Sequence, residues 1–474
     1  MEIIAKYNEY YKDIFRFGKS FKLINIIIII VFVSLITWLT IKSNYLIGAG
    51  TVLSILVIFL FIRYPRLWLY TVAALAGFFI RSSSNEISVL DVIFGFLYVA
   101  TLFIWLFWMI VVKKERLIRN ISDLILLFFF IVLILNSLIA ALNGVDMIIW
   151  LREYLLFSIT LFYFPIRYYL SNKKDLIRLL FILSLAILVD DFVQYYFYYK
   201  KTFTELVYVF QLGSSVRFSQ TIYTSAIAFG VLFAVYNKNI AYRLYFIFFT
   251  VFTFAALVLT FSRTFWVVAL LNIVIIFLFV KNQQKFRILL YSFIISAVIL
   301  TGVTFVLKDK ADYFVKLVEK RFISTSELKR DPSVQTRLSE YSQVMRKIEG
   351  AFLGGNGMGK PFKYFDTIKG YHNNSYFVHN GYLYFAYRLG IPLALCFFFV
   401  FLYNLFKSFI LIFKCKDEFY RILLIGAFCS LILLLIANFS TTVFNNRDGV
   451  FVVIFSYALL GLSEEKIFNN INNC

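Results

Sequence analysis

Residues 122–142 read SDLILLFFFIVLILNSLIAAL, and this stretch decides the fold class. Apolar residues fill it almost continuously instead of alternating with polar ones, which favours a helix over a half-buried strand. As a helix it is about 30 Å long, which matches the hydrocarbon core of a bilayer. Only helices and closed barrels satisfy the backbone in that environment. The stretch therefore predicts a transmembrane helix.

Similar apolar runs recur along the whole chain of 474 residues, of which 61% are hydrophobic and 20% aromatic. Soluble domains are only about half apolar. The sequence thus predicts an all-α polytopic integral membrane protein with 12 to 14 spans, because the runs near 67–80 and 449–463 are short. The spans are expected near 23–41, 46–62, 67–80, 89–112, 122–142, 147–166, 176–198, 220–236, 244–261, 264–280, 288–307, 380–405, 422–438 and 449–463.

The formal net charge is +21, and the position of the basic residues along the chain explains this surplus. They gather in alternate connections, which the positive-inside rule assigns to the cytoplasm, so the charge does not indicate nucleic-acid binding. Both termini are then cytoplasmic. The predicted organisation is an N-terminal bundle of about 11 helices (1–307), a large extracytoplasmic loop with short amphipathic helices (308–378), and about three C-terminal helices (379–474).

The loop at 308–378 is the longest polar interval and carries thirteen Lys or Arg against eight Asp or Glu. This surplus fits either a solvated surface or a basic vestibule for an anion. A helix is predicted at 334–348, with Arg337 and Glu340 three residues apart on one face. A solvent-exposed Arg337–Glu340 pair of little energetic weight is the interpretation that the spacing favours. The other face carries Leu338, Tyr341, Met345 and Ile348.

Both histidines of the chain, His372 and His379, lie at the end of this interval. They are seven residues apart with no cysteine and only Asp366 nearby, which is a poor metal site. His379 precedes Asn380 at the edge of the next apolar run. An acid/base or hydrogen-bonding role suits it better, and no metal is expected.

Residues 354–360 spell G-x-x-x-x-G-K, as in a phosphate-binding P-loop. Pro361 stands where the magnesium-binding Ser or Thr would be, and no buried strand precedes the glycines. We therefore interpret the segment as a glycine-rich turn. Its backbone, at Gly355 and Gly357 above all, either passes close to another surface or donates amides to an anion.

Charged residues in or beside spans are costly unless they are paired or face a cavity. Arg263 lies at the outer end of a tight hairpin without an acidic neighbour along the chain, and either reaches the interface or points into a cavity and holds a phosphate. Arg152 and Glu153 are interpreted as a local pair or an interfacial anchor. Asp190 and Asp191 lie late in a span, near its outer end.

The order of these elements resembles the O-antigen ligase and O-antigen polymerase superfamily of bacterial polysaccharide assembly. The resemblance rests on RLSE at 337–340, LGGNGMG at 353–359, HNGYL at 379–383 and LGI at 389–391, with weaker support from RFS at 217–219 and Ser262-Arg263. Ala351-Phe352 stands where the family often carries a proline before the glycine turn.

The resemblance implies a GT-C-like membrane glycosyltransferase that needs neither a nucleotide sugar nor a metal or other cofactor. Its donor and acceptor would be glycans on undecaprenyl pyrophosphate, handled at the outer face of the bacterial inner membrane. Arg217, Arg263 and Arg337 would hold the leaving pyrophosphate. His379 would be the base, with Glu340 as the competing residue. Asn380 would orient His379 or a sugar hydroxyl, and His372 would bind the pyrophosphate or another part of the substrate.

Three functions remain open on this basis. The chain length and the number of spans favour a Wzy-type polymerase, with a possible chain-length regulator as partner. A ligase that transfers the glycan to lipid A-core shares the motif. A lipid-linked oligosaccharide flippase is the alternative from another class, but two similar halves with mid-membrane charges, as in transporters, are not evident in the sequence.

Overall fold

The structure is a computed structural model that describes residues 61, 63–79, 95–203, 219–307, 319, 332–367 and 370–471. The chain divides into a unit at 1–68 and a unit at 69–474, and the second unit contains the large loop and the helices around it. The predicted span near 23–41, nearly all of the one near 46–62, and Arg217 lie outside the described residues.

Helices form wherever the described sequence is continuously apolar, and short polar residues begin several of them. Asn120, for example, accepts from the amide of Asp123 while Asp123 accepts from the amide of Asn120. The helices are α4 (Pro65–Phe79), η1 (Gly95–Ala100), α6 (Thr101–Phe107), η2 (Trp108–Val112), α7 (Ile121–Leu142), α8 (Met147–Ser158), η3 (Ile159–Phe162), α9 (Tyr163–Tyr169), α10 (Lys173–Phe203), α12 (Gln220–Tyr236), α13 (Ile240–Val258), α14 (Arg263–Phe279), α15 (Asn282–Leu307), α17 (Pro332–Glu349), α18 (Gly381–Leu389), α19 (Ile391–Lys414), α20 (Glu418–Ala437), η6 (Val443–Asn445) and α21 (Arg447–Ile471).

Five helical segments of the described part are long and apolar enough to cross a membrane: 121–142, 147–169, 240–258, 391–414 and 418–437. The prediction of an all-α polytopic membrane protein is confirmed. The total of 12 to 14 spans and the GT-C-like architecture stay predictions. The run at 380–405, expected as one span, is two helices, because Gly390 adopts φ +84° between α18 and α19.

Contacts at helix ends show which ends lie together. The start of α7 lies near the end of α21, where Arg119 pairs with Glu465 at 3.1 Å. The residue after α7, Asn143, donates to the carbonyl of Asn356 in the glycine turn. Gly381, which begins α18, donates to the carbonyl of Asn438 at the end of α20. The loop, the end of α7 and the end of α20 therefore share one side, which the sequence predicts to be extracytoplasmic.

Two buried ion pairs lie at opposite ends of this bundle. Arg167 of α9 contacts Asp123 of α7 at 2.7 Å, at the end where α21 finishes. Arg388 of α18 contacts Glu153 of α8 at 2.8 Å, at the end that carries the loop. A buried charge is stable only with such a partner.

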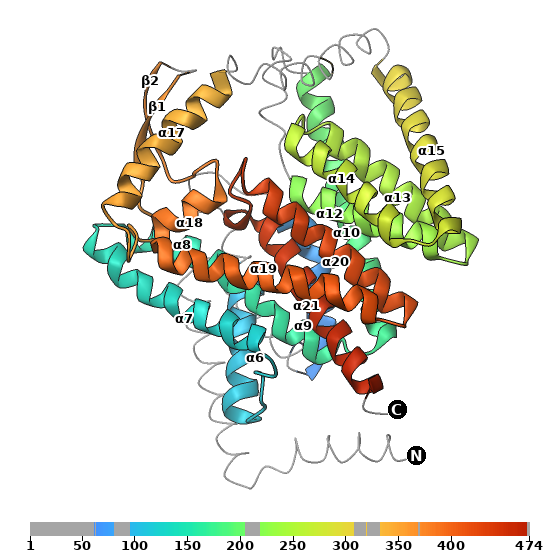
Figure 1. Cartoon of the computed structure of the whole chain (residues 1–474), viewed down its shortest axis with the longest axis horizontal. Helices are drawn as coiled ribbons and strands as arrows, with labels where there is room; N and C mark the ends of the chain where they lie inside the picture. The colour runs from blue at the N-terminus through green and yellow to red at the C-terminus, as the bar shows by residue number, and fades with distance from the viewer. Residues whose placement is uncertain are drawn as a thin grey trace, which may run out of the picture. The chain divides into compact units, whose positions relative to one another are not determined.

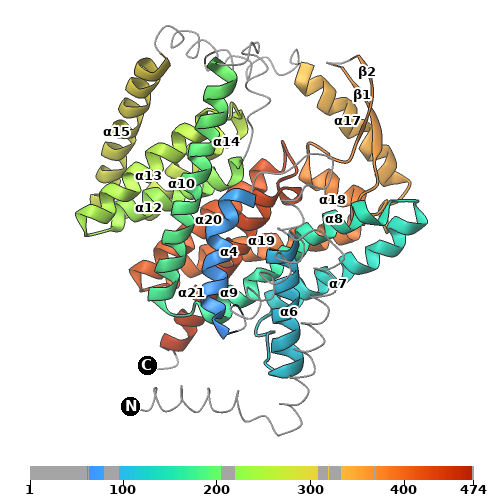
Figure 2. The same cartoon turned by 180° about the vertical axis from the view of Figure 1, so that it is seen from behind.

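The described part of the loop contains α17, the glycine turn, and an antiparallel hairpin of β1 (Phe362–Asp366) and β2 (Tyr371–Ser375). Phe365 pairs with His372 in the register. Figures 1 and 2 show α17 and the hairpin side by side, next to α18 and α8. The sequence predicted only short amphipathic helices here, so the hairpin is an addition.

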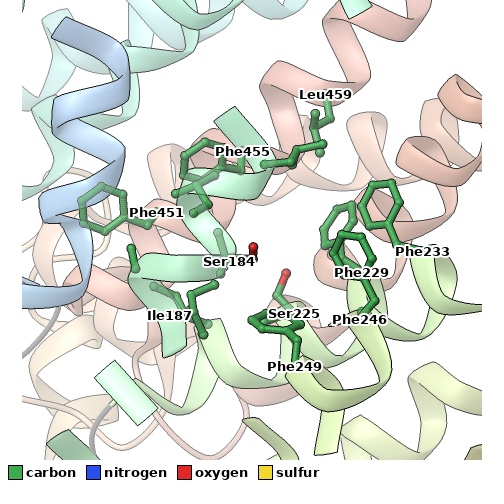
Figure 3. Close-up of a pocket in the computed structure, with 17 residues that line it drawn as sticks. Ser184, Ile187, Ser225, Phe229, Phe233, Phe246, Phe249, Phe451, Phe455 and Leu459 are labelled. Carbon is green, nitrogen blue, oxygen red and sulfur yellow. The ribbon is translucent and has the colours of Figure 1, made fainter. Parts of the chain in front are cut away.

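An apolar cavity lies between α10, α12, α13 and α21 (Figure 3). Phenylalanines such as Phe229, Phe249 and Phe455 line it, with Ser184 and Ser225 as its polar residues. Ser184 hydrogen-bonds Tyr245 and Ser225 hydrogen-bonds Ser430. None of the described residues that line this cavity is titratable.

Candidate active site

The structure brings His379 and Glu340 together across the loop. Nδ1 of His379 lies 2.7 Å from Oε2 of Glu340, and the His379 amide donates to Oε1 at 2.6 Å. Glu340 is 0% exposed, whereas the His379 side chain is 39% exposed. In the neutral imidazole, an Nδ1–H that donates to the carboxylate leaves Nε2 without a proton. The pair therefore presents a basic nitrogen at an accessible position.

The prediction of an exposed Arg337–Glu340 pair is wrong, because Glu340 lies on the buried face of α17. The buried residues of α17 are Thr336, Glu340, Val344 and Ile348, which recur every fourth residue. Leu338 and Met345, predicted on the apolar face, are 53% and 50% exposed. Within the described part of the chain, Arg337 is half-buried and has no acidic partner. It interacts electrostatically with Tyr341 one turn later.

The backbone of His379 is held on both sides. The Tyr341 hydroxyl of α17 donates to the His379 carbonyl at 2.6 Å. Burial raises the pKa of Tyr341 to about 12, against the opposing effect of Arg337, so the hydroxyl stays protonated at neutral pH. Thr442, just after α20, donates to the carbonyl of Val378. Helices distant in sequence thus fix the position of the imidazole.

We expect Tyr341→Phe to slow glycan transfer, because it removes the hydrogen bond to the His379 carbonyl while keeping the ring. A single buried hydrogen bond contributes about 1 kcal/mol. Tyr382→Phe is the matched control, since the Tyr382 hydroxyl donates to the Leu435 carbonyl at 2.7 Å. Both variants should lose similar thermal stability, and only Tyr341→Phe should lose rate. Equal rates in the two variants would contradict this role for Tyr341.

The glycine turn is packed against the helices. Gly355 and Gly357 have φ of +71° and +87°, and a Cβ on Gly357 would lie 2.6 Å from the Cα of Ala140 in α7. The amide of Gly355 donates to the Ala351 carbonyl and that of Gly357 to the Arg388 carbonyl. Of the two expectations for this turn, close approach to another surface is therefore the one seen. Neither of these amides is left for an anion.

Arg388, which the sequence did not single out, is buried near the His379–Glu340 pair. It is 1% exposed and contacts Glu153, which accepts also from the Gly359 amide at 2.9 Å and the Tyr384 hydroxyl at 2.9 Å. Glu153 therefore pairs across the structure with Arg388, and the local pairing expected with Arg152 is not the one seen. A lone arginine within the apolar run at 380–405 was the available signal.

Asn380, predicted to orient His379 or a sugar hydroxyl, and His372, predicted to bind the substrate, both have roles in local structure. Asn380 caps α18, because its side chain accepts from the amides of Tyr382 and Leu383. His372 lies on the exposed face of β2, with its ring 5.4 Å from that of Phe365. The contacts of Asn380 and His372 with substrate stay predictions.

Arg263 begins α14 and is half-buried. Arg421 at the start of α20 donates to the carbonyl of Phe279 at the end of α14, so these helices run antiparallel. Arg263 thus lies at the same end of the bundle as Asn438, which contacts Gly381 beside His379. A position at this end of the bundle is consistent with the prediction that Arg263 holds the pyrophosphate.

Asp190 and Asp191 are buried in α10 and accept hydrogen bonds from hydroxyls of the neighbouring helices. Tyr223 donates to Asp190 at 2.7 Å and Thr253 donates to Asp191 at 2.8 Å. These carboxylates connect α10 to α12 and α13.

Residues 248–398 match a family model described as O-antigen ligase (Wzy_C). The matched segment runs from α13 into α19 and contains Arg263, the loop, the His379–Glu340 pair and Arg388. The resemblance to the O-antigen ligase and polymerase superfamily is confirmed over this segment. No curated protein matches the chain.

Proposed function

We propose that this protein transfers a lipid-linked glycan to an acceptor hydroxyl, as an O-antigen polymerase of the Wzy type. The family match supports a glycosyl-transferring membrane enzyme of the O-antigen ligase and polymerase type. The observation that carries glycosyl transfer is the His379–Glu340 pair within the matched segment. An accessible imidazole backed by a fully buried carboxylate is the arrangement of a general base. The choice of a polymerase rests on the chain length and the number of predicted spans.

The reaction requires one base and one group of cations. Nε2 of His379 takes the proton of the acceptor hydroxyl, and the hydroxyl oxygen bonds to the anomeric carbon of the donor. The bond from that carbon to the pyrophosphate oxygen breaks, and the electron pair leaves with the undecaprenyl pyrophosphate. Arg337 and Arg263 supply the positive charge that stabilises the leaving group. Arg337 suits this role because no described carboxylate neutralises it.

Ligation to lipid A-core is the second candidate, and the description of the matched family favours it. Both reactions need the same base and the same leaving group, and they differ in the acceptor. In a polymerase the acceptor is another lipid-linked repeat unit on the outer face of the inner membrane. In a ligase it is a lipid core.

Purified protein in nanodiscs, incubated with undecaprenyl-pyrophosphate-linked repeat units, tests the proposal. We expect a ladder of glycan lengths on a gel without any other acceptor. Arg337→Ala should abolish the ladder, whereas Arg346→Ala, which removes an exposed arginine of the same helix, should preserve it.

Transfer that occurs only after a lipid core is added would establish the ligase in place of the polymerase. Failure to consume the donor with either acceptor would overturn both assignments. A ladder of wild-type intensity from Arg337→Ala would show that the reaction does not need Arg337. It would not contradict the assignment of His379 as the base.

A further inference from the structure

Arg388 holds both ends of the β-hairpin with one guanidinium group. Nη1 donates to the carbonyl of Lys360, which lies just before β1. Nη2 donates to the carbonyl of Tyr376, just after β2, at 2.7 Å. No long side chain other than arginine offers a planar fork of donors that reaches two carbonyls at once. The hairpin is therefore tied to α18 at its base.

Glu153 completes this connection from the transmembrane bundle. Its Oε1 lies 2.8 Å from Nη2 of Arg388, and its Oε2 accepts from the amide of Gly359, two residues before Pro361. The pair is buried, so the low dielectric strengthens these charge-assisted hydrogen bonds. Through Glu153 and Arg388, α8 and α18 together define where the hairpin begins and ends.

The end of β2 is followed, four residues later, by His379. The hydrogen bond between Tyr376 and Arg388 closes a segment of the chain that contains His379 and α18 as far as Arg388. Within that segment, His379 meets Glu340 and Tyr341 of α17 through bonds of 2.6–2.7 Å. A shift of Tyr376 would therefore move the imidazole relative to Glu340.

We propose that Arg388 is a positioning residue for the transfer reaction, which holds the segment 376–379 so that His379 meets Glu340. The proposal rests on the proposed function of His379. It assigns Arg388 no contact with the substrate. Loss of Arg388 should therefore lower kcat while KM changes little, because a base displaced by about 1 Å can slow a reaction about 100-fold.

The test compares two charge-balanced double variants in nanodiscs. Arg388→Met/Glu153→Gln removes the pair at the loop, and Arg167→Met/Asp123→Asn removes the equivalent buried pair at the opposite end. We expect kcat to fall about 10- to 100-fold in the first and to stay within about 3-fold in the second. Amide hydrogen exchange at 376–380 should rise only in the first variant.

Arg388→Lys gives a second measurement if the double variant folds poorly. Lysine keeps the charge opposite Glu153, but one ammonium group does not reproduce the fork to Lys360 and Tyr376. We expect it to fold, with faster exchange at 376–380 and a lower kcat. Wild-type kcat and wild-type exchange in this variant would overturn the proposal.

The experiments distinguish a failure of His379 as the base from a failure of Arg388 as a positioning residue. If His379→Ala transfers glycan at the wild-type rate, the base assignment is wrong, and the exchange at 376–380 still decides whether Arg388 holds the hairpin. If His379→Ala is inactive while the Arg388 variants keep both kcat and exchange, the base assignment stands and Arg388 is not a positioning residue.

Discussion

We expect Glu340→Gln to lower the rate of glycan transfer by about 100- to 10,000-fold, which is the range that a general base contributes. The side chain keeps its size, but its amide group donates to Nδ1 of His379 where the carboxylate accepts. The imidazole then carries its proton on Nε2 and no longer takes one from the acceptor hydroxyl. His379→Ala should show a loss of the same order. The measurement is the initial rate of donor consumption by purified protein.

Glu349→Gln is the matched control, because Glu349 lies on the same helix and is exposed. It should transfer at the wild-type rate. The double variant Glu340→Gln/His379→Ala should be no slower than His379→Ala alone, since residues that act as one unit are not additive. A wild-type rate in Glu340→Gln would show that the carboxylate only holds the loop in place.

The sequence could predict the membrane class and could single out His379 and Glu340 as candidates, but it could not predict that these two residues are in contact. Continuous apolar runs identify spans because each membrane-spanning segment must be apolar and must form its backbone hydrogen bonds within itself. The spacing of Arg337 and Glu340 indicates a pair only within one helix. The contact that forms instead joins residues 39 positions apart, and it depends on how α17 is rotated against α18. One sequence carries no signal for that rotation.

The same reason applies to Glu153 and Arg388, which are 235 residues apart. Each was visible as a charge in an apolar run, and burial required each to have a partner. The nearest opposite charge in sequence, Arg152, was the natural expectation for Glu153. Tertiary packing of α8 against the loop selected Arg388 instead. The requirement for a partner was predictable, but its identity was not.

Gly357→Ala is expected to destabilise the folded protein by more than about 3 kcal/mol and to prevent assembly of the site. Alanine at a positive φ costs about 1–2 kcal/mol by itself. The added Cβ would also lie 2.6 Å from the Cα and 2.8 Å from the amide nitrogen of Ala140, which are backbone atoms of α7. Backbone atoms do not rotate away as a side chain does, so α7 and the turn must separate. That separation breaks the hydrogen bond from the Met358 amide to Asn136.

Gly370→Ala separates the effect of packing from that of conformation. Gly370 also has a positive φ, +73°, but a Cβ there meets nothing within 4 Å. We expect it to lose only the conformational term, about 1–2 kcal/mol, and to keep its transfer activity. Thermal unfolding of the two variants in the same detergent measures the difference. If Gly357→Ala unfolds at the temperature of Gly370→Ala, the turn tolerates a side chain against α7, and its contact with Ala140 is not what positions the loop.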